Sequence, residues 1–222
     1  MANDLETMRQ RLRDVLFDTD DATWNAGEKD DILYMAVNRL SRRIPRPINP
    51  ADEATDITLE TETYTYDLGT YTSITKILLS NSSGDQIGYL ESGWEVIGDL
   101  EAGYADLYVS PRVVESYVGG TLRLIGYGRY TLNTLAEEIA LSGANSTCIL
   151  DEHVPLVLAW AQEAAWRRLL SDRARFRQWQ NANQTQNVSV NEIVQMISDA
   201  SRQADEEWAL RRRFQSPVIG RI

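Results

Sequence analysis

The sequence predicts an α+β protein in which a four-helix bundle carries an inserted small antiparallel β domain and ends in an extended C-terminal tail. Amphipathic helical patterns open and close the chain, and a block with strand periodicity lies between them. Residues 1–50 hold 8 Lys/Arg against 9 Asp/Glu, residues 51–150 hold 4 against 15, and residues 151–222 hold 10 against 9. We therefore expect residues 1–50 and 151–213 to form the bundle, residues 51–150 the acidic β-rich domain with its connector, and residues 214–222 the tail.

The first two helices are predicted from capping boxes followed by apolar stripes. Asn3 with Glu6, and Asn25 with Glu28, have the spacing at which an N-cap side chain and a partner satisfy free backbone amides. The second helix should end before Pro45 and Pro47. The apolar stripes are Leu5, Met8, Leu12, Val15 and Leu16 in the first helix, and Leu33, Ala36, Val37, Leu40 and Ile44 in the second.

The middle block is rich in Thr, Tyr, Val and Ile in short runs that turn sequences separate. We expect strands at 57–68, 71–80, 86–91, 104–110 and 121–127, forming a small antiparallel sheet or barrel. Acidic residues alternate with the apolar positions, and we single out Glu60, Glu62, Asp99 and Glu101 as a channel-facing or tail-facing surface. Such a face is a solvated strand surface, or it repels phosphate or meets a basic partner.

A third helix is predicted from 152 to 183, with Asp151 as its cap. Its first half is apolar nearly all round, so it needs partners on more than one side. The residues off its main stripe are candidates for a subunit interface, with a central helix covered by its own chain as the alternative: Leu156, Trp160, Trp166 and Leu170. Ser189 and Glu192 form the capping box of a fourth helix, which would close the bundle.

The C-terminal segment alternates arginine with apolar residues, a composition typical of a docking segment that becomes ordered on a partner. The alternative is that the segment packs on its own bundle. The residues concerned are Arg211, Arg212, Arg213, Phe214, Val218, Ile219, Arg221 and Ile222.

Several functional classes are disfavoured by what the sequence lacks. His153 is the only histidine and stands in no triad or metal-binding motif, and Cys148 is the only cysteine. No phosphate-binding or dinucleotide-binding glycine motif occurs. We expect no catalytic residues, no metal and no cofactor, and hence no enzyme.

The net charge of -11 disfavours a general nucleic-acid binder. The sequence shows no signal peptide or membrane span, so we expect synthesis in the cytoplasm and no membrane association.

Three stretches of sequence resemble a known family. Residues 8–18, Trp24 and residues 31–40 resemble the start of head-to-tail connector proteins of tailed bacteriophages, also called adaptor or head-completion proteins. Residues 150–161 resemble the third helix of the longer members of that family. Many of those proteins are short four-helix chains, and the block from Ile57 to Tyr130 departs from that pattern.

The resemblance implies a structural protein of the virion neck, made in the host cytoplasm. Twelve copies would form a homo-oligomeric ring beneath the portal protein, contact tail or neck proteins, and extend the channel through which DNA passes without sequence-specific binding. The C-terminal segment would reach the portal. Two alternatives stay open: another neck or tail-completion protein without portal docking, and a cytosolic DNA-packaging accessory protein with a basic DNA-binding surface.

Overall fold

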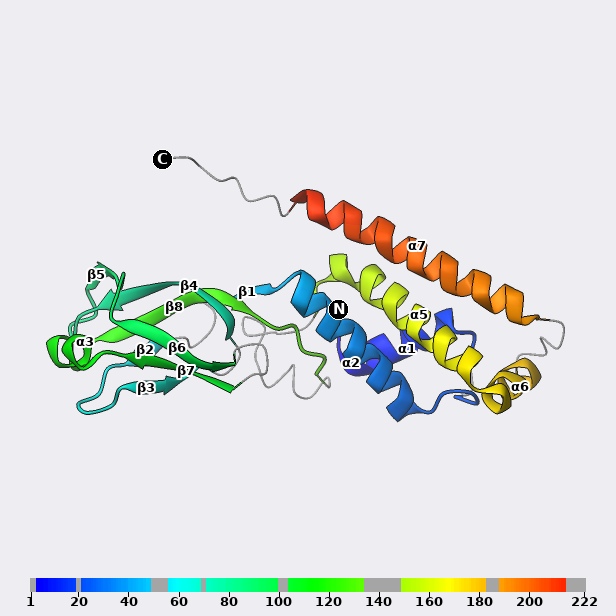
Figure 1. Cartoon of the computed structure of the whole chain (residues 1–222), viewed down its shortest axis with the longest axis horizontal. Coiled ribbons are helices and arrows are strands. Elements are labelled where there is room, and N and C mark those ends of the chain that lie inside the picture. Colours follow the sequence, from blue (N-terminus) through cyan, green and yellow to red (C-terminus); the bar gives the residue numbers. More distant parts are fainter. Residues whose placement is uncertain are drawn as a thin grey trace. The chain divides into compact units, whose positions relative to one another are not determined.

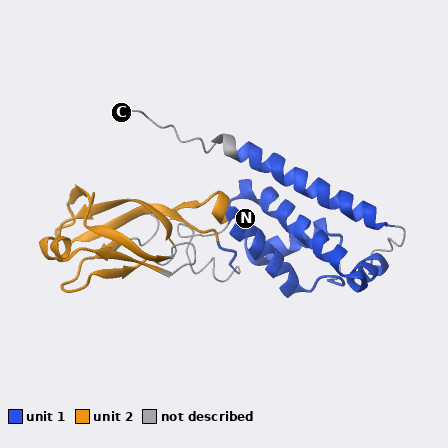
Figure 2. Cartoon of the chain, viewed as in Figure 1, with its two compact units in different colours: residues 1–40, 131–140, 147–222 blue, residues 41–130, 141–146 orange. Residues whose placement is uncertain are grey.

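The computed structural model describes residues 3–18, 21–48, 56–68, 71–99, 104–133, 149–182 and 188–214 (Figure 1). The chain divides into two compact units (Figure 2). The first contains residues 1–40, 131–140 and 147–222, and the second contains residues 41–130 and 141–146. The second unit begins earlier than the expected residue 51 because Arg46–Ile48 forms strand β1, which pairs with a strand of the sheet.

The first unit is helical. It contains α1 (Leu5–Val15), most of α2 (Ala26–Arg43), a 3₁₀ turn (Asp151–His153), α5 (Val154–Ser171), α6 (Arg173–Ala182) and α7 (Val190–Phe214). The mixed helical and sheet class is confirmed. The four-helix bundle is not, because the described part of this unit holds five α-helices. Arg211 to Phe214 continue α7 as helix, and the expected extended segment after residue 214 lies outside the described residues.

The helix caps agree with the sequence at two of four predicted starts. Backbone and side-chain groups of Asn25 and Glu28 exchange hydrogen bonds of 3.0 Å each, and the amide of Glu192 donates to Ser189 Oγ. At α1, however, the N-cap is Asp4, whose carboxylate accepts from the Thr7 amide at 2.8 Å. The prediction of Asn3 as cap was wrong, because the Asn3 side-chain amide is buried and donates to the Ile149 carbonyl instead. Asp151 is not the cap of α5, because it lies inside the 3₁₀ turn, α5 has His153 at its N-cap position, and the Asp151 carboxylate accepts a hydrogen bond from the Asn3 side chain.

The predicted helix 152–183 is two helices. Asp172 separates them, with extended backbone angles of φ -124° and ψ 103°. Its carboxylate accepts hydrogen bonds from the amides of Ala174 and Arg175, at 2.9 and 3.1 Å. An aspartate that satisfies free amides in this way starts a new helix at α6 and stops the preceding one.

The core of the helical unit is centred on α5, which packs against α1, α6 and α7. Three buried tryptophans meet at its C-terminal half. The Trp166 ring lies edge-to-face with Trp24 at 5.8 Å between centroids and with Trp179 at 5.5 Å. Edge-to-face contacts of this kind add to the hydrophobic energy of burying large rings. They fix α5 to the loop after α1 and to α6.

The second unit consists of two antiparallel sheets. One has the order β1-β8-β4-β5, with β2 also pairing β8, and the other has the order β3-β7-β6. Its remaining strands are β2 (Asp56–Thr58), β3 (Thr65–Asp67), β4 (Tyr71–Ser80), β5 (Gln86–Tyr89), β6 (Trp94–Asp99), β7 (Tyr104–Val109) and β8 (Thr121–Gly128), and α3 (Pro111–Ser116) is a short helix between β7 and β8. The predicted run 57–68 is split between the two sheets, and β1 and β6 were not predicted.

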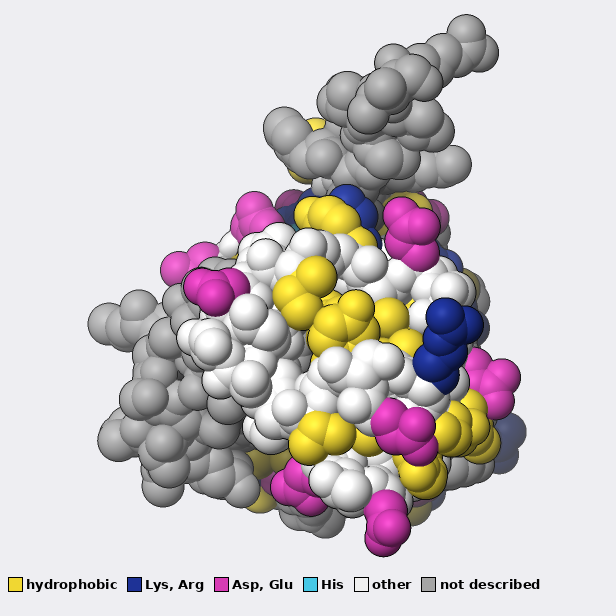
Figure 3. All heavy atoms as spheres, turned by 90° about the vertical axis from the view of Figure 1, so that its left-hand side faces the viewer, with side chains coloured by type: hydrophobic (Ala, Val, Ile, Leu, Met, Phe, Trp, Pro, Cys, Tyr) yellow, Lys and Arg dark blue, Asp and Glu magenta, His cyan; other side chains and the backbone are white. Residues whose placement is uncertain are grey.

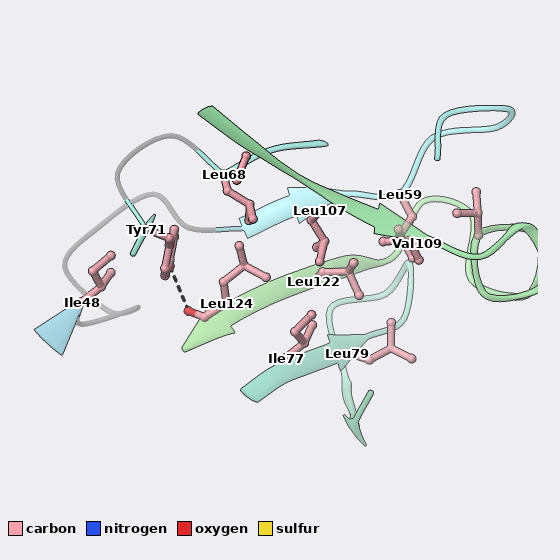
Figure 4. Close-up of a cluster of buried hydrophobic side chains, with 12 residues drawn as sticks. Ile48, Leu59, Leu68, Tyr71, Ile77, Leu79, Leu107, Val109, Leu122 and Leu124 are labelled. Atoms are coloured by element: carbon pink, nitrogen blue, oxygen red, sulfur yellow. Dashed lines mark hydrogen bonds between the residues drawn. The ribbon is translucent and has the colours of Figure 1, made fainter. Parts of the chain in front are cut away.

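Burial alternates along the strands of the second unit, as expected where one face of each sheet is solvated. On β8, Leu122 and Leu124 are buried while Arg123 between them is exposed. Figure 3 shows acidic side chains spread around an apolar area on the outside of this unit. The inward-facing residues of both sheets form one core together with Leu59, Leu68 and Val114, which lie just after β2, just after β3 and in α3 (Figure 4). The full set is Ile48, Leu59, Leu68, Tyr71, Ile77, Leu79, Ala105, Leu107, Val109, Val114, Leu122 and Leu124.

Candidate interaction surfaces

Helix α7 packs along α5 with one face only (Figure 1). Its buried residues are Ile193, Ala200 and Ala204, and the two alanines allow the helices to approach closely. Val190 and Val194 remain 55% and 50% exposed although they lie four residues apart on one side of the helix. One flank of α7 therefore presents apolar side chains to solvent.

That flank borders a shallow groove of about 700 Å³. Val194 and Ile197 provide its apolar part, and two arginines and two carboxylates surround the remainder. The lining residues are Arg167 of α5 and, on α7, Val194, Ile197, Ser198, Ser201, Arg202, Asp205, Glu206 and Ala209. We call these residues the α7 groove. An apolar strip with a charged rim is the usual composition of a protein–protein contact.

The C-terminal end of α7 is held to the start of α5 by Arg211. Its Nε donates to His153 Nδ1 at 3.3 Å, and its Nη1 donates to the carbonyl and carboxylate of Glu207. Nη2 donates to the carbonyl of Glu152. Arg211, predicted as part of the portal-binding segment, thus packs on its own unit, which was the alternative stated for it. Arg212, Arg213 and Phe214 continue the helix, whereas Val218, Ile219, Arg221 and Ile222 lie outside the described residues.

His153 is the buried side chain that meets Arg211, and it is 5% exposed. Burial lowers the pKa of its imidazole, the Glu152 carboxylate opposes this effect, and the Arg211 guanidinium lowers the pKa further. The neutral ring can accept the Arg211 hydrogen bond through Nδ1, and the protonated ring cannot. The neutral His153 ring therefore helps to hold the C-terminal end of α7 by accepting the hydrogen bond from Arg211.

Three of the four residues proposed as a subunit interface on α5 are buried by the chain itself. Leu156, Trp160 and Trp166 are 0%, 3% and 0% exposed, and the Arg39 guanidinium lies over the Trp160 ring at 4.6 Å. Leu170 is half-buried. The prediction rested on the excess apolar surface of this helix, and the burial of three of the four residues removes that reason. α5 matches the stated alternative of a central helix covered by its own unit.

The acidic surface residues are not brought together as a site in the described structure. Glu60 and Glu62 are exposed in the turn between β2 and β3. Asp99 is the last residue of β6, and Glu101 lies outside the described residues. On the neighbouring sheet, Arg123 forms two 2.7 Å hydrogen bonds to Asp56 and lowers the pKa of that carboxyl.

A buried ion pair at the turn after α1 was not predicted. Lys29 Nζ lies 2.8 Å from Asp18 Oδ2, both side chains are fully buried, and Lys29 also contacts Asp21. The Asp18 carboxylate accepts hydrogen bonds from the Thr23 and Trp24 amides as well. The sequence does indicate this ion pair. Lys29 lies four residues before Leu33 on the apolar stripe of its helix, and a charge at such a buried position needs a buried partner.

Among the described residues, no group of His, Cys, Asp and Glu side chains could hold a metal ion. None of the described helices has the length and apolarity to cross a membrane.

Comparisons with known proteins give little further information. No protein family model matches the sequence, and no curated protein does. A chain from a solved structure described as "Neck of empty GTA particle computed with C6 symmetry" has a TM-score of 0.28 and 13% identity, over 74% of this chain and 77% of that chain. At this level of likeness no shared fold is established, and we draw no functional conclusion from it.

Proposed function

We propose that this protein is a structural, non-enzymatic subunit of the neck of a tailed phage particle. Copies of the chain form a ring of twelve beneath the portal, connect the DNA-filled head to the tail and extend the DNA channel. The proposal begins from the sequence resemblance of residues 8–18, 31–40 and 150–161 to connector proteins. The structural observation that carries it is the exposed apolar flank of α7 beside the α7 groove.

The α7 groove is the proposed contact between neighbouring subunits. In a ring, one surface of each subunit meets a different surface of the next, so the α7 groove would supply one side of each repeated contact. Helix α5 offers less apolar surface for this purpose, because Leu156, Trp160 and Trp166 are already buried within the unit. Val194 and Ile197 would lose their remaining contact with water on assembly, which favours association.

The arginine-containing C-terminal segment and the acidic second unit have separate proposed roles. The segment from Arg212 to Ile222 is proposed to dock on the portal, while Arg211 holds α7 in place. The acidic second unit is proposed to face the channel or a tail protein. An acidic channel wall repels phosphates, so DNA would pass without being retained.

Electron microscopy of the protein mixed with its portal tests this proposal. Val194→Glu places a charge in the α7 groove, whereas Val118→Glu is a matched control, because Val118 is 45% exposed and lies in the other unit. We expect rings with the wild type and the control but not with Val194→Glu. Rings formed equally by all three would contradict the groove as contact, and absence of any ring on the portal would contradict the connector role.

A further inference from the structure

Strand β5 is an edge of its sheet, and its register shows which backbone groups face outward. It pairs with β4 through Leu78 opposite Tyr89 and Leu79 opposite Gly88, and the Leu90 amide donates to the Ile77 carbonyl at 2.9 Å. In an antiparallel ladder, alternate residues direct their N–H and C=O groups to the same neighbour. Gly88 and Leu90 therefore face β4, and Tyr89 directs its N–H and C=O away from it. In the described structure no strand pairs with that outer edge.

A hollow of about 630 Å³ lies beside this edge, in the second unit alone. Its walls are β5, the turn at residues 91–93 and α3. Leu79, Leu90 and Val113 contribute apolar surface, and Ile87 and Tyr89 at its rim are 50% and 56% exposed. An exposed apolar area is visible on this side of the molecule (Figure 3).

The charges around the hollow select the kind of partner. Glu91 and Arg112 line it, Asp85 is exposed in the turn before β5, and Glu115 is exposed on α3. Lys76 lies 5.2 Å from the centroid of the Tyr89 ring, so three carboxylates and two cations lie in or near the hollow. Residues 51–150 as a whole carry 4 basic against 15 acidic residues. Nucleic acid is repelled by such a surface, and a basic polypeptide is attracted to it.

We propose that β5 accepts an extended basic segment of a partner protein, which adds as a strand to its free edge. The backbone of the added segment bonds to the outward groups of Tyr89, as in other cases of strand addition. An apolar side chain of that segment enters the hollow between β5 and α3, and flanking Lys or Arg residues meet Glu91 and its neighbours. This inference does not depend on the connector role, because it concerns a single copy of the chain.

The experiment uses two acetylated octapeptides, one alternating Arg and Val and the other alternating Glu and Val. Binding to the full-length protein is followed by ¹⁵N NMR and by hydrogen exchange. We expect the Arg–Val peptide to bind, to protect the Tyr89 amide from exchange and to shift signals of β5 and α3. Equal binding of the Glu–Val peptide, or binding without effect on β5, would overturn the proposal.

Substitutions test the contributions of the backbone and of the side chains to peptide binding separately. Tyr89→Pro removes the outward N–H, a change that an edge strand tolerates, and we expect affinity to fall about five- to tenfold relative to Tyr89→Val, which keeps that group. Ile87→Ser at the rim should also weaken binding. Ile97→Ser is the matched control, because Ile97 is 48% exposed on β6, in the other sheet. Equal affinity of Tyr89→Pro and Tyr89→Val, or equal weakening by both serine variants, would contradict strand addition at β5.

Discussion

Helices α5 and α7 lie side by side in the helical unit, yet they use their apolar residues differently. Leu156, Trp160 and Trp166 of α5 are covered by the chain itself. α7 buries Ile193 and two alanines but leaves Val190 and Val194 half exposed. The number of apolar residues on a helix therefore does not identify the helix that meets a partner. What matters is how much of that apolar surface the rest of the unit covers.

The largest expected effect is the loss of the central tryptophan of α5. Trp166→Ala removes a fully buried ring that contacts Trp24 and Trp179, and such truncations cost about 3–5 kcal/mol of unfolding free energy. Denaturant unfolding monitored by circular dichroism measures this cost. Trp166→Phe, which keeps a ring in the site, should cost clearly less. A loss below about 1 kcal/mol for the alanine variant would mean that α5 is not the centre of the core.

A similar loss is expected from breaking the buried ion pair. Lys29→Met leaves the fully buried Asp18 carboxylate without its cation, and removing one partner of a buried pair costs about 3–5 kcal/mol. The same unfolding experiment applies. Arg202→Met is a suitable control, because its ion pair with Asp199 is largely exposed. Equal effects of the two variants would contradict the burial of Lys29.

A smaller loss of stability is expected at the C-terminal end of α7 when the pH is lowered. The pKa of His153 is lowered in the folded protein, so the unfolded chain binds this proton more readily. The contribution of His153 to stability is complete above its ordinary pKa of 6.5 and is lost as the pH falls from there through the lowered folded pKa. We expect the protection factors of amides near Arg211, which correct for the pH dependence of intrinsic exchange, to fall over this range. His153→Asn should remove that pH dependence, and an unchanged profile in the variant would contradict it.

The smallest effect on stability is expected at the acidic surface. Glu60→Gln with Glu62→Gln should leave the melting temperature unchanged, because both side chains are exposed. If the second unit faces DNA, this variant should change DNA ejection or retention. If it faces a basic tail protein, filled heads should fail to join tails. Infectious particles with normal ejection would contradict both roles and leave a solvated face.

The fold class and the starts of α2 and α7 could be predicted from the sequence, because capping and periodicity depend on neighbouring residues. Asn25 with Glu28 and Ser189 with Glu192 are such local signals. The break at Asp172 has a local cause too, but a continuous apolar stripe concealed it. The division of residues 57–68 between two sheets depends on pairing with β8 and β7, which are distant in sequence.

The candidate surfaces were harder to predict, because burial depends on the whole unit. Trp160 appeared surplus on a helical stripe until Arg39 and the neighbouring helices were seen to cover it. Arg211 had the composition of a docking segment, and only the structure shows its contact with His153. The edge position of β5 likewise follows from strand order and not from its own four residues.

Hydrogen–deuterium exchange of the free protein and of the assembled ring on the portal tests the comparison of the two helices most directly. Assembly should slow exchange in residues 190–202 of α7, since the α7 groove becomes covered by the neighbouring subunit. Exchange in residues 156–166 of α5 should stay the same, because Leu156, Trp160 and Trp166 are already buried in the free chain. Protection of α5 with unchanged exchange in α7 would contradict the assignment of the α7 groove as the assembly surface.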